Sequence, residues 1–223
     1  QLGVDKEKVL VTGNIKFDLT SIPMQDNHHQ EWKTDGMILV FGSTRPGEEG
    51  PIMEALLELQ KEFTGLIGVI APRHMERCRE VEDLIREFEV EYALLSKQGN
   101  LTNCNVLLVD SLGKLNAFYK SATVTYVGGG FNPRFGGHNI LEPAALGKPV
   151  LFGKFMNNFE EEAKLLKQSE GGLQLQNIEE LYDVLKRLLM NPDERQKLSQ
   201  SAEKTVKANS GALRKNIELI RST

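Results

Sequence analysis

Residues 123–152 constrain the fold more than any other stretch of this sequence. They begin with a β-branched segment at 123–127, typical of a buried strand, that runs into three glycines at 128–130. A loop and a helix entry near 139–142 follow, and a second short apolar strand lies at 150–152. A strand, glycine loop, helix and strand in a right-handed crossover place the loop at the carboxyl edge of a parallel sheet. Glycines without Cβ let a ligand approach backbone N–H groups, so this loop suits an anionic or nucleotide-like ligand.

The same alternation of strand and helix signals extends over most of the chain. Short apolar runs closed by glycine, proline or polar residues predict strands, and longer segments with apolar positions at helical spacing predict helices between them. Further strands are expected from residue 9 to a turn at Gly13, and at 37–41, 66–70, 92–95, 106–109 and 173–175. Further helices are expected at 48–63, 81–88, 114–119, 158–168, 178–190, from 192 onward and at 212–220. The pattern predicts a Rossmann-like α/β fold, a doubly wound parallel sheet with helices on both faces.

Composition sets the broad class. The 223 residues are 40% apolar and 26% charged, which is enough for one large α/β domain. A net charge of −4 and a pI near 5.7 argue against a nucleic-acid partner, because binding to a phosphate backbone needs a basic face. Two cysteines without metal or redox spacing indicate a reducing compartment. No run approaches the ~18 apolar residues of a membrane span.

Candidate functional residues gather at the expected carboxyl ends of strands, where a doubly wound sheet binds its ligands. Ser43 and Thr44 either cap the helix that follows or, together with Arg45, bind an anion. Arg73 comes directly after a strand and Pro72. A surface charge is the ordinary explanation for an arginine, but this position favours a ligand role.

Two more strand ends carry similar signals. Ser111 is followed by Gly113 and Lys114, which place a cation near the positive end of a helix dipole where an acid is usual. That choice favours a bound phosphate over a plain serine cap. Asn139 and Glu142 form a capping box in the simpler interpretation. In the functional one, Glu142 accepts hydrogen bonds from paired sugar hydroxyls.

Four motifs then stand in order along the chain. They are Gly-Asn-Ile-Lys-Phe-Asp at 13–18, Gly-Ser-Thr-Arg at 42–45 with Gly-Glu-Glu at 47–49, Pro-Arg-His at 72–74 with Glu76 and Arg77, and a glycine motif running from 128–129 through Gly-Gly-His-Asn at 136–139 to Leu-Glu-Pro-Ala at 141–144. The series resembles the C-terminal half of 3-deoxy-D-manno-octulosonic acid (Kdo) transferases. The resemblance runs from about residue 9 to the last residue, and the order of the motifs makes it specific.

The resemblance implies a GT-B glycosyltransferase, with two Rossmann-like domains that face a cleft. The C-terminal domain would bind CMP-Kdo, and the acceptor would be the lipid A precursor at the cytoplasmic face of the Gram-negative inner membrane. The family inverts the anomeric centre without a metal or other cofactor, and its general base is a glutamate of the N-terminal domain. We therefore expect residues 1–35 to contain an interdomain connection and a first strand, and residues 36–223 to form the nucleotide-sugar-binding domain. The chain starts within continuing sequence, so we expect a soluble fragment that binds the donor weakly and transfers no sugar.

The resemblance also assigns roles to individual residues. Lys16 would stabilise charge on the leaving phosphate in the transition state. The predicted donor-binding residues are Ser43, Arg45, Pro72, Arg73, Leu112, Gly113, Lys114, Gly128, Gly129, His138, Asn139, Ile140, Leu141 and Glu142. Two departures stand out. Lys114 takes the place of the family's usual glutamate, and the loop at 130–135 differs from the common one.

Two other functions are compatible with these motifs. A UDP-sugar epimerase of similar two-domain architecture would prefer UDP and would need acid and base carboxylates that the sequence does not identify. A non-catalytic nucleotide-binding domain would keep the phosphate turns but would have no reason to keep Lys16. A panel of nucleotides separates the first alternative from a Kdo transferase, and joining the chain to an N-terminal half separates the second.

Overall fold

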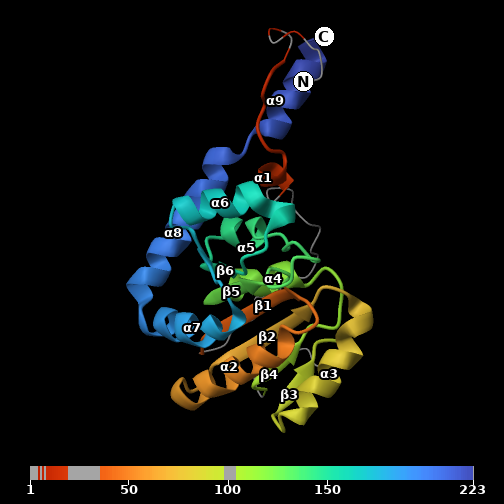
Figure 1. The fold of residues 1–223 in the computed structure, drawn as a ribbon, viewed down its shortest axis with the longest axis vertical. Helices are drawn as coiled ribbons and strands as arrows, with labels where there is room; N and C mark the ends of the chain where they lie inside the picture. Colours follow the sequence, from red (N-terminus) through yellow and green to blue (C-terminus); the bar gives the residue numbers. More distant parts are fainter. Residues whose placement is uncertain (1–4, 6, 8, 20–35, 98–103, 223) are drawn as a thin grey trace.

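The computed structural model describes residues 5, 7, 9–19, 36–97 and 104–222. Its centre is a parallel sheet with the strand order β3-β4-β2-β1-β5-β6-β7 (Figure 1). The strands are β1 (Ile38–Thr44), β2 (Ile67–Pro72), β3 (Tyr92–Leu94), β4 (Val106–Leu108), β5 (Val124–Val127), β6 (Val150–Phe152) and β7 (Gly172–Gln174). Every paired strand runs parallel to its neighbour. The doubly wound parallel sheet predicted from the sequence is therefore confirmed.

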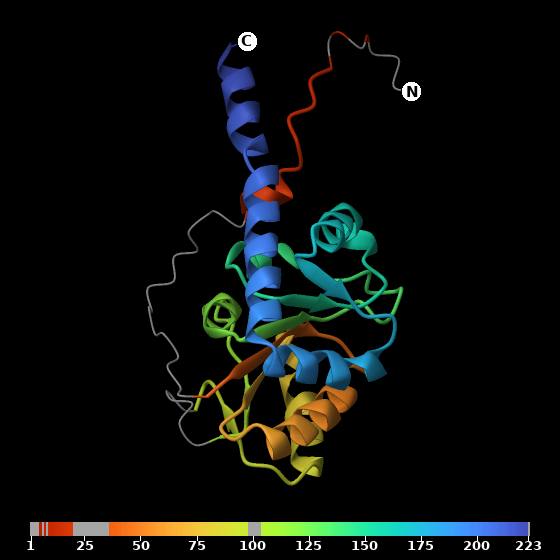
Figure 2. The ribbon, with the colours of Figure 1, turned by 90° about the vertical axis from the view of Figure 1, so that its left-hand side faces the viewer.

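Helices cover both faces of this sheet. They are α1 (Lys16–Leu19), α2 (Glu49–Glu62), α3 (Cys78–Glu87), α4 (Leu115–Ser121), α5 (Leu141–Ala145), α6 (Glu160–Gln168), α7 (Leu181–Met190), α8 (Pro192–Asn209) and α9 (Ala212–Ser222). Short 3-10 turns at Met75–Arg77, Asn157–Phe159 and Ile178–Glu180 lead into α3, α6 and α7. Figure 2 shows α8 as a long helix along one side of the sheet, with α9 continuing beyond it.

Two hydrophobic clusters hold the layers together. One packs α2, α3 and α7 on the face of β1 that carries Leu39 and Phe41. The other packs α4, α5, α6 and α8 on the opposite face, where Val40 lies. Alternate residues of a strand point to opposite faces, so a strand buried on both sides is a continuous apolar run. Each fully buried side chain such as Leu56 contributes about 1.5 to 3 kcal/mol to folding.

The chain reverses its winding direction between β1 and β5. From β1 it proceeds to β2, then to β3 at the edge and back to β4 between them, and on the other side it runs from β5 through β6 to β7. The carboxyl ends of β1 and β5 therefore flank the switch point of the sheet, which is where open α/β sheets bind their ligands.

The first expected strand was wrong. Residues 9–14 form no strand, and Val9, Leu10 and Val11 are 54%, 70% and 91% exposed. Within the described residues no strand lies beside them, and β-branched residues form a strand only where a neighbour supplies ladder hydrogen bonds. The chain forms α1 instead, where the Asp18 carboxylate accepts hydrogen bonds from the N–H groups of Gly211 and Leu213 and so caps α9.

One more expectation concerns the start of the domain. Residues 1–35 were expected to contain an interdomain connection, and residues 20–35 of that stretch lie outside the described residues, so the proposed boundary at residue 36 stays a prediction. In both views the N-terminal segment and α9 extend from the same end of the domain (Figures 1 and 2). None of the helices in the described part of the chain has the length and apolar character that crossing a bilayer requires.

Candidate functional site

The end of β1 contains a local distortion that starts the site. The register of β1 with β2 shifts between Gly42 and Thr44, and Ser43 has a left-handed φ of 55°. The left-handed region of φ is costly for a residue other than glycine. Bulges and strained residues of this kind concentrate at functional sites, where they redirect the chain. Here the bulge directly precedes Arg45, the first of the predicted cations at the strand ends.

Arg45 is held from two sides. Its Nε donates a hydrogen bond of 2.9 Å to Nε2 of His138, and its guanidinium lies 4.7 Å from the centre of the Phe135 ring. His138 can accept this bond only as the neutral imidazole. Burial, together with the positive charges of Arg45, Arg73 and His74, lowers the pKa of His138 to about 4. His138, predicted as a donor-binding residue, thus uses Nε2 to orient an arginine.

Arg73 follows β2 and lies close to the same group. Its backbone N–H donates to the Thr44 carbonyl, and its side chain is exposed. Burial, and next the charge of Arg73, lower the pKa of Arg45. Among the described residues, neither guanidinium has a carboxylate within ion-pair distance. The strand-end edge therefore presents two neighbouring cations whose charge the described part of the chain leaves uncompensated.

The buried carboxyl of Glu48 joins several parts of this edge through hydrogen bonds. Glu48 is 4% exposed, and its carboxyl accepts hydrogen bonds from the N–H of Arg45 at 2.9 Å, the N–H of Gly129 at 2.8 Å and the hydroxyl of Tyr126 at 3.0 Å. Burial raises the pKa of Glu48 to about 7 even though these hydrogen bonds act in the opposite direction. Sequence analysis had placed Glu48 in the Gly-Glu-Glu motif at 47–49 but had assigned it no role.

The glycines of the loop are required by packing. A Cβ on Gly128 would lie 2.5 Å from Oε2 of Glu48, and one on Gly129, whose φ is 82°, would lie 2.8 Å from the His138 ring. The N–H of Gly128 donates to the Gly42 carbonyl, and that of Gly129 donates to Glu48. The expectation that these two N–H groups face a ligand is therefore wrong, because internal acceptors already occupy them.

Asn139 and Glu142 lie where β5 leads into α5. Oδ1 of Asn139 accepts a hydrogen bond from the N–H of Leu141, and its Nδ2 donates to Oε1 of Glu142 at 3.0 Å. Burial raises the pKa of Glu142, while Asn139 and the nearby charge of Arg73 act against that rise. Ile140 and Leu141 are buried in the core, so only their backbone is available to a ligand. Asn139 thus accepts the first N–H of α5, but the N-cap position is Ile140 and Glu142 is bonded to the Asn139 side chain instead of its backbone N–H, so the expected reciprocal capping box is absent.

The remaining predicted residues lie around this group. Pro72 is buried at the end of β2, whereas Leu112 is 80% exposed. Gly113 has a φ of 74°, and Lys114 occupies the N-cap position of α4 without a side-chain cap. Ser111 is therefore not the cap that the simpler interpretation expected.

Lys16 lies outside the cluster. Its Nζ donates to the Asn158 carbonyl at 2.7 Å, lies 3.2 Å from Oε1 of the buried Glu162, and sits 4.6 Å from the centre of the Phe159 ring. The Asn158 side chain in turn donates to the carbonyls of Phe135 and Gly137. Lys16 thus contacts the residue that supports the loop but does not reach the strand-end cations. Sequence analysis had assigned no role to Asn158.

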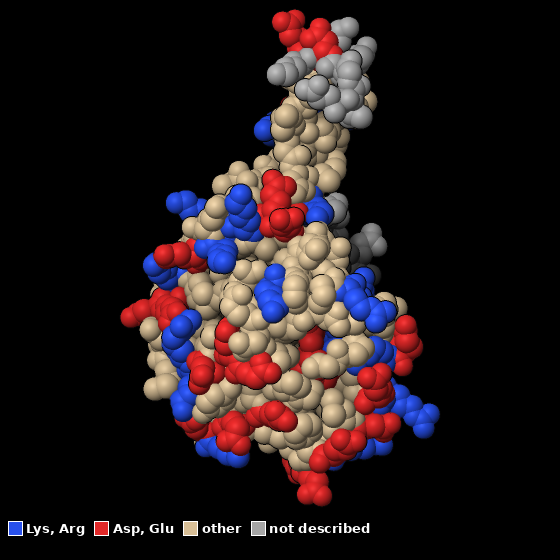
Figure 3. Space-filling view, in the orientation of Figure 1, with Lys and Arg blue, Asp and Glu red and all other residues tan. Residues whose placement is uncertain are grey.

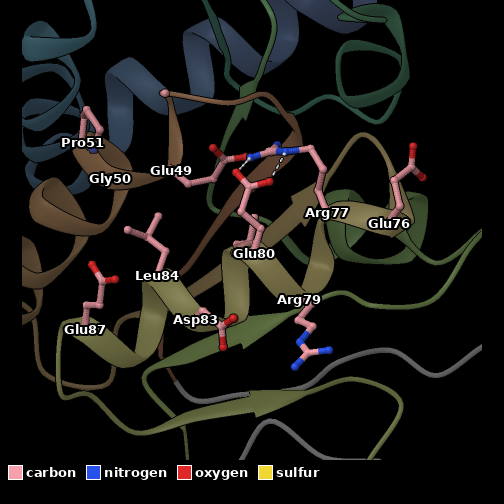
Figure 4. Close-up of a pocket in the computed structure, with 12 residues that line it drawn as sticks. Glu49, Gly50, Pro51, Glu76, Arg77, Arg79, Glu80, Asp83, Leu84 and Glu87 are labelled. Atoms are coloured by element: carbon pink, nitrogen blue, oxygen red, sulfur yellow. Dashed lines mark hydrogen bonds and ion pairs between the residues drawn. The ribbon is translucent and has the colours of Figure 1, made fainter.

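A groove of about 820 Å³ lies beside the cluster, between α2 and α3 (Figure 4). On its wall the guanidinium of Arg77 contacts Glu49 at 2.7 Å and Glu80 at 3.0 Å. Both ion pairs are drawn in Figure 4, where the three side chains point toward one another. On this wall Arg77 has two carboxylate partners, in contrast to Arg45 and Arg73.

Two wider features bear on possible ligands. The face in Figure 3 shows acidic and basic side chains interspersed rather than gathered by sign. In the part of the chain that the structure describes, no three His, Cys, Asp or Glu side chains come together as they would to hold a metal ion.

Comparison with known proteins gives a consistent relationship. No family model matches the chain. A 3-deoxy-D-manno-octulosonic acid transferase of Chlamydia pneumoniae is 30% identical over 227 aligned residues, which cover 99% of this chain and 52% of the relative. The crystal structure of the C-terminal CMP-Kdo-binding domain of WaaA from Acinetobacter baumannii superposes with a TM-score of 0.74 and 28% identity, over 86% of this chain and 97% of that one.

A more distant structure shares the fold alone. The UDP-GlcNAc 2-epimerase of Neisseria meningitidis bound to UDP-GlcNAc has a TM-score of 0.62 at 15% identity, over 99% of this chain and 56% of that one. The chain spans about half the length of the curated relatives it matches.

Proposed function

We propose that this chain, a relative of the C-terminal half of Kdo transferases, is the donor-binding domain of an inverting glycosyltransferase that takes Kdo from CMP-Kdo. The acceptor of the complete enzyme would be the lipid A precursor at the cytoplasmic face of the bacterial inner membrane. One observation carries the proposal most directly. A domain that binds CMP-Kdo in a relative matches this chain over 97% of its own length, and the matched sheet carries two uncompensated guanidinium groups at its switch point.

The geometry suits the binding of a nucleoside monophosphate that is esterified to a sugar. Arg73 would contact the phosphate, because a guanidinium is always charged and presents a planar fork of donors to an oxyanion. Glu142, held by Asn139 and close to Arg73, would accept hydrogen bonds from the ribose hydroxyls. The turn with Leu112, Gly113 and Lys114 would bring a further cation to the phosphate.

The chemistry follows from the leaving group. An acceptor hydroxyl attacks the anomeric carbon, a new C–O bond forms, the bond from that carbon to the phosphate oxygen breaks, and CMP leaves with the electron pair. The cations at the strand ends stabilise the negative charge that develops on the phosphate, which is an electrostatic contribution to catalysis. The proton of the acceptor passes to a general base, which in the family is a glutamate of the N-terminal domain.

Lys16 is proposed to stabilise the same charge. Its Nζ is engaged with Glu162 and the Asn158 carbonyl, so it would have to exchange one of these contacts for a phosphate oxygen. The alternative contribution is indirect, through Asn158 and the loop that carries His138. A Lys16→Met variant that loses transfer in a full-length enzyme but still binds CMP would favour the direct role.

Calorimetric titration tests the proposal. The chain is titrated with CMP and, as controls, with UMP, GMP and AMP, and the experiment is repeated with Arg73→Ala and Glu142→Ala. We expect CMP to bind selectively and both variants to lose at least tenfold in affinity, because a hydrogen bond to a charged group contributes about 1.5 to 3 kcal/mol. Arg79→Ala, which removes an exposed arginine of the groove, is the matched control and should leave the affinity unchanged.

Two results would contradict the proposal. Preferential binding of UMP would favour an epimerase-like specificity, and binding of no nucleotide would remove the donor site from this chain. Turnover of CMP-Kdo onto a lipid acceptor by this chain alone would contradict the expectation that it lacks the general base.

A further inference from the structure

The proposed donor carries two negative groups, and they differ in shape and position. One is the phosphodiester that joins the nucleoside to the sugar. The other is the carboxylate on the anomeric carbon of the sugar, which lies on the far side of the phosphate from the ribose. A site for this donor therefore needs two cations in a fixed order along its length.

The strand-end edge offers two neighbouring cations. Arg73 follows β2 and Arg45 follows the adjacent β1, and the N–H of Arg73 donates to the carbonyl of Thr44, the residue before Arg45. Two adjacent guanidinium groups suit two neighbouring anionic groups, one the phosphate and the other the sugar carboxylate.

Arg45 is also pre-oriented. His138 accepts from its Nε, and the Phe135 ring lies against its guanidinium. Its backbone N–H is fixed by the buried Glu48. Among the described residues, its two terminal nitrogens have no hydrogen-bond partner. A guanidinium fixed through Nε keeps the fork of terminal nitrogens that recognises a carboxylate bidentately.

We propose, as an extension of the function proposed above, that Arg45 binds the carboxylate of the donor sugar and that His138 is a positioning residue that orients Arg45. His138 contributes as a neutral acceptor, and the charged or titratable groups that face it are Arg45 itself, together with Arg73 and His74 from the end of β2. Arg45 therefore distinguishes an activated 2-ulosonate from a nucleotide that lacks the carboxylate.

Two ligands separate the carboxylate from the rest of the donor. The chain is titrated with CMP and with CMP-Kdo, and the readout is the ratio of the two dissociation constants. We expect CMP-Kdo to bind the wild type about tenfold or more tightly than CMP, which corresponds to one charge-assisted contact. In Arg45→Ala that ratio falls to about one, whereas in Arg73→Ala both ligands weaken together. Arg79→Ala in the groove is the matched control and keeps the wild-type ratio, and thermal melting of each variant verifies its fold.

The role of His138 is tested separately. His138→Ala should reduce the ratio, His138→Gln, which keeps an acceptor oxygen, should restore part of it, and the double variant with Arg45→Ala should be no worse than Arg45→Ala alone. A glutamine cannot carry a charge, so partial rescue by His138→Gln excludes a protonated His138 as the group that binds the ligand. A His138→Gln variant no better than His138→Ala would make the positioning role wrong.

The outcomes distinguish the two proposals. If the wild-type chain does not bind CMP, the proposed donor site is wrong, and so is this inference. A wild type that binds CMP selectively, while Arg45→Ala keeps the full preference for CMP-Kdo, leaves the donor site in place and overturns the role of Arg45.

Discussion

Arg73 and Arg77 both follow β2, but their surroundings differ. Arg77 lies on the wall of the groove, where its side chain is 11% exposed and pairs with the buried Glu49 and the exposed Glu80. Arg73, four positions earlier, has no carboxylate partner among the described residues and lies beside Arg45. The two regions are adjacent, but among the described residues only Arg77 has carboxylate partners.

The comparison separates charges that stabilise the folded state from charges that are available to a ligand. A buried ion pair that loses one member leaves an uncompensated charge, so the pair is a requirement of the folded state. Two adjacent guanidinium groups repel each other, and the folded state gains nothing from them until an anion arrives. Uncompensated charge at the switch point of a parallel sheet is therefore where we propose that the ligand binds.

The largest effect should come from the paired region. Arg77→Met leaves Glu49 buried without its partner, and we expect the free energy of unfolding to fall by about 3 to 5 kcal/mol. Urea unfolding measures this loss, and the double variant with Glu49→Gln should recover part of it. If folded Arg77→Met lost CMP binding tenfold or more, the groove would belong to the ligand site and the comparison would fail.

The next prediction concerns Glu48, the buried acid between the paired and the unpaired region. It compares the free energies of unfolding of Glu48→Gln and the wild type over a range of pH. Burial raises the pKa of Glu48 from 4.5 to about 7, so the folded state keeps a proton that the unfolded chain has released. The stabilisation by this protonated carboxyl is complete below pH 4.5 and is lost as the pH rises through 7. We therefore expect the variant to gain about 2 to 3 kcal/mol relative to the wild type between pH 4.5 and 8.

The wild type alone does not reveal this slope. The lowered pKa of His138 makes its contribution to stability rise with pH between about 4 and 6.5, which opposes that of Glu48. Urea midpoints of both proteins at each pH isolate Glu48. A difference that stays constant across the series would mean that Glu48 is ionised in the folded state throughout.

Two glycine variants compare the loop with the groove. Gly128→Ala places a Cβ 2.5 Å from Glu48 Oε2 and from the Ser43 carbonyl, and we expect a loss of about 1 to 3 kcal/mol. Gly50→Ala in α2, at the groove, meets nothing within 4 Å and should be neutral or up to about 1 kcal/mol stabilising. Thermal unfolding of both variants provides the measurement, and equal losses would show that packing around Glu48 is not what requires a glycine at 128.

The smallest change in stability should come from the unpaired region. Arg73→Ala removes a repelling neighbour of Arg45 and no ion pair, so its free energy of unfolding should stay within about 0.5 kcal/mol of the wild type. The same variant is expected to lose CMP affinity. A stability loss as large as that of Arg77→Met would mean that Arg73 is a structural residue after all.

Much of the fold could be predicted because its signals are local. The strands at residues 38–44 and 150–152 are continuous apolar runs that end at a glycine or a polar turn, and the helices between them carry apolar stripes at helical spacing. The strand expected at residue 9 failed because a β-branched segment says nothing about whether a neighbouring strand exists.

The site was predictable only in outline. Arg45, Arg73, His138 and Glu142 come together because each follows a strand of one parallel sheet, and their roles toward a ligand stay predictions. The hydrogen bond from Gly129 to Glu48 joins residues 81 positions apart, and no local pattern indicates it. Nor does a sequence show that His138, in a group of cations, is an acceptor. Those features depend on which side chains share a buried volume after the sheet has closed.

The place of β1 in the middle of the sheet has a consequence for synthesis of the chain. One of its neighbours, β2, follows directly, but the N–H of Ile38 finds its partner Thr123 beside β5, 85 residues later. At about 5 to 20 residues per second, the ribosome needs roughly 4 to 17 s to supply that partner. During this interval the apolar edge of β1 stays open to other chains, so expression at lower temperature or with more chaperone should raise the soluble yield of this domain.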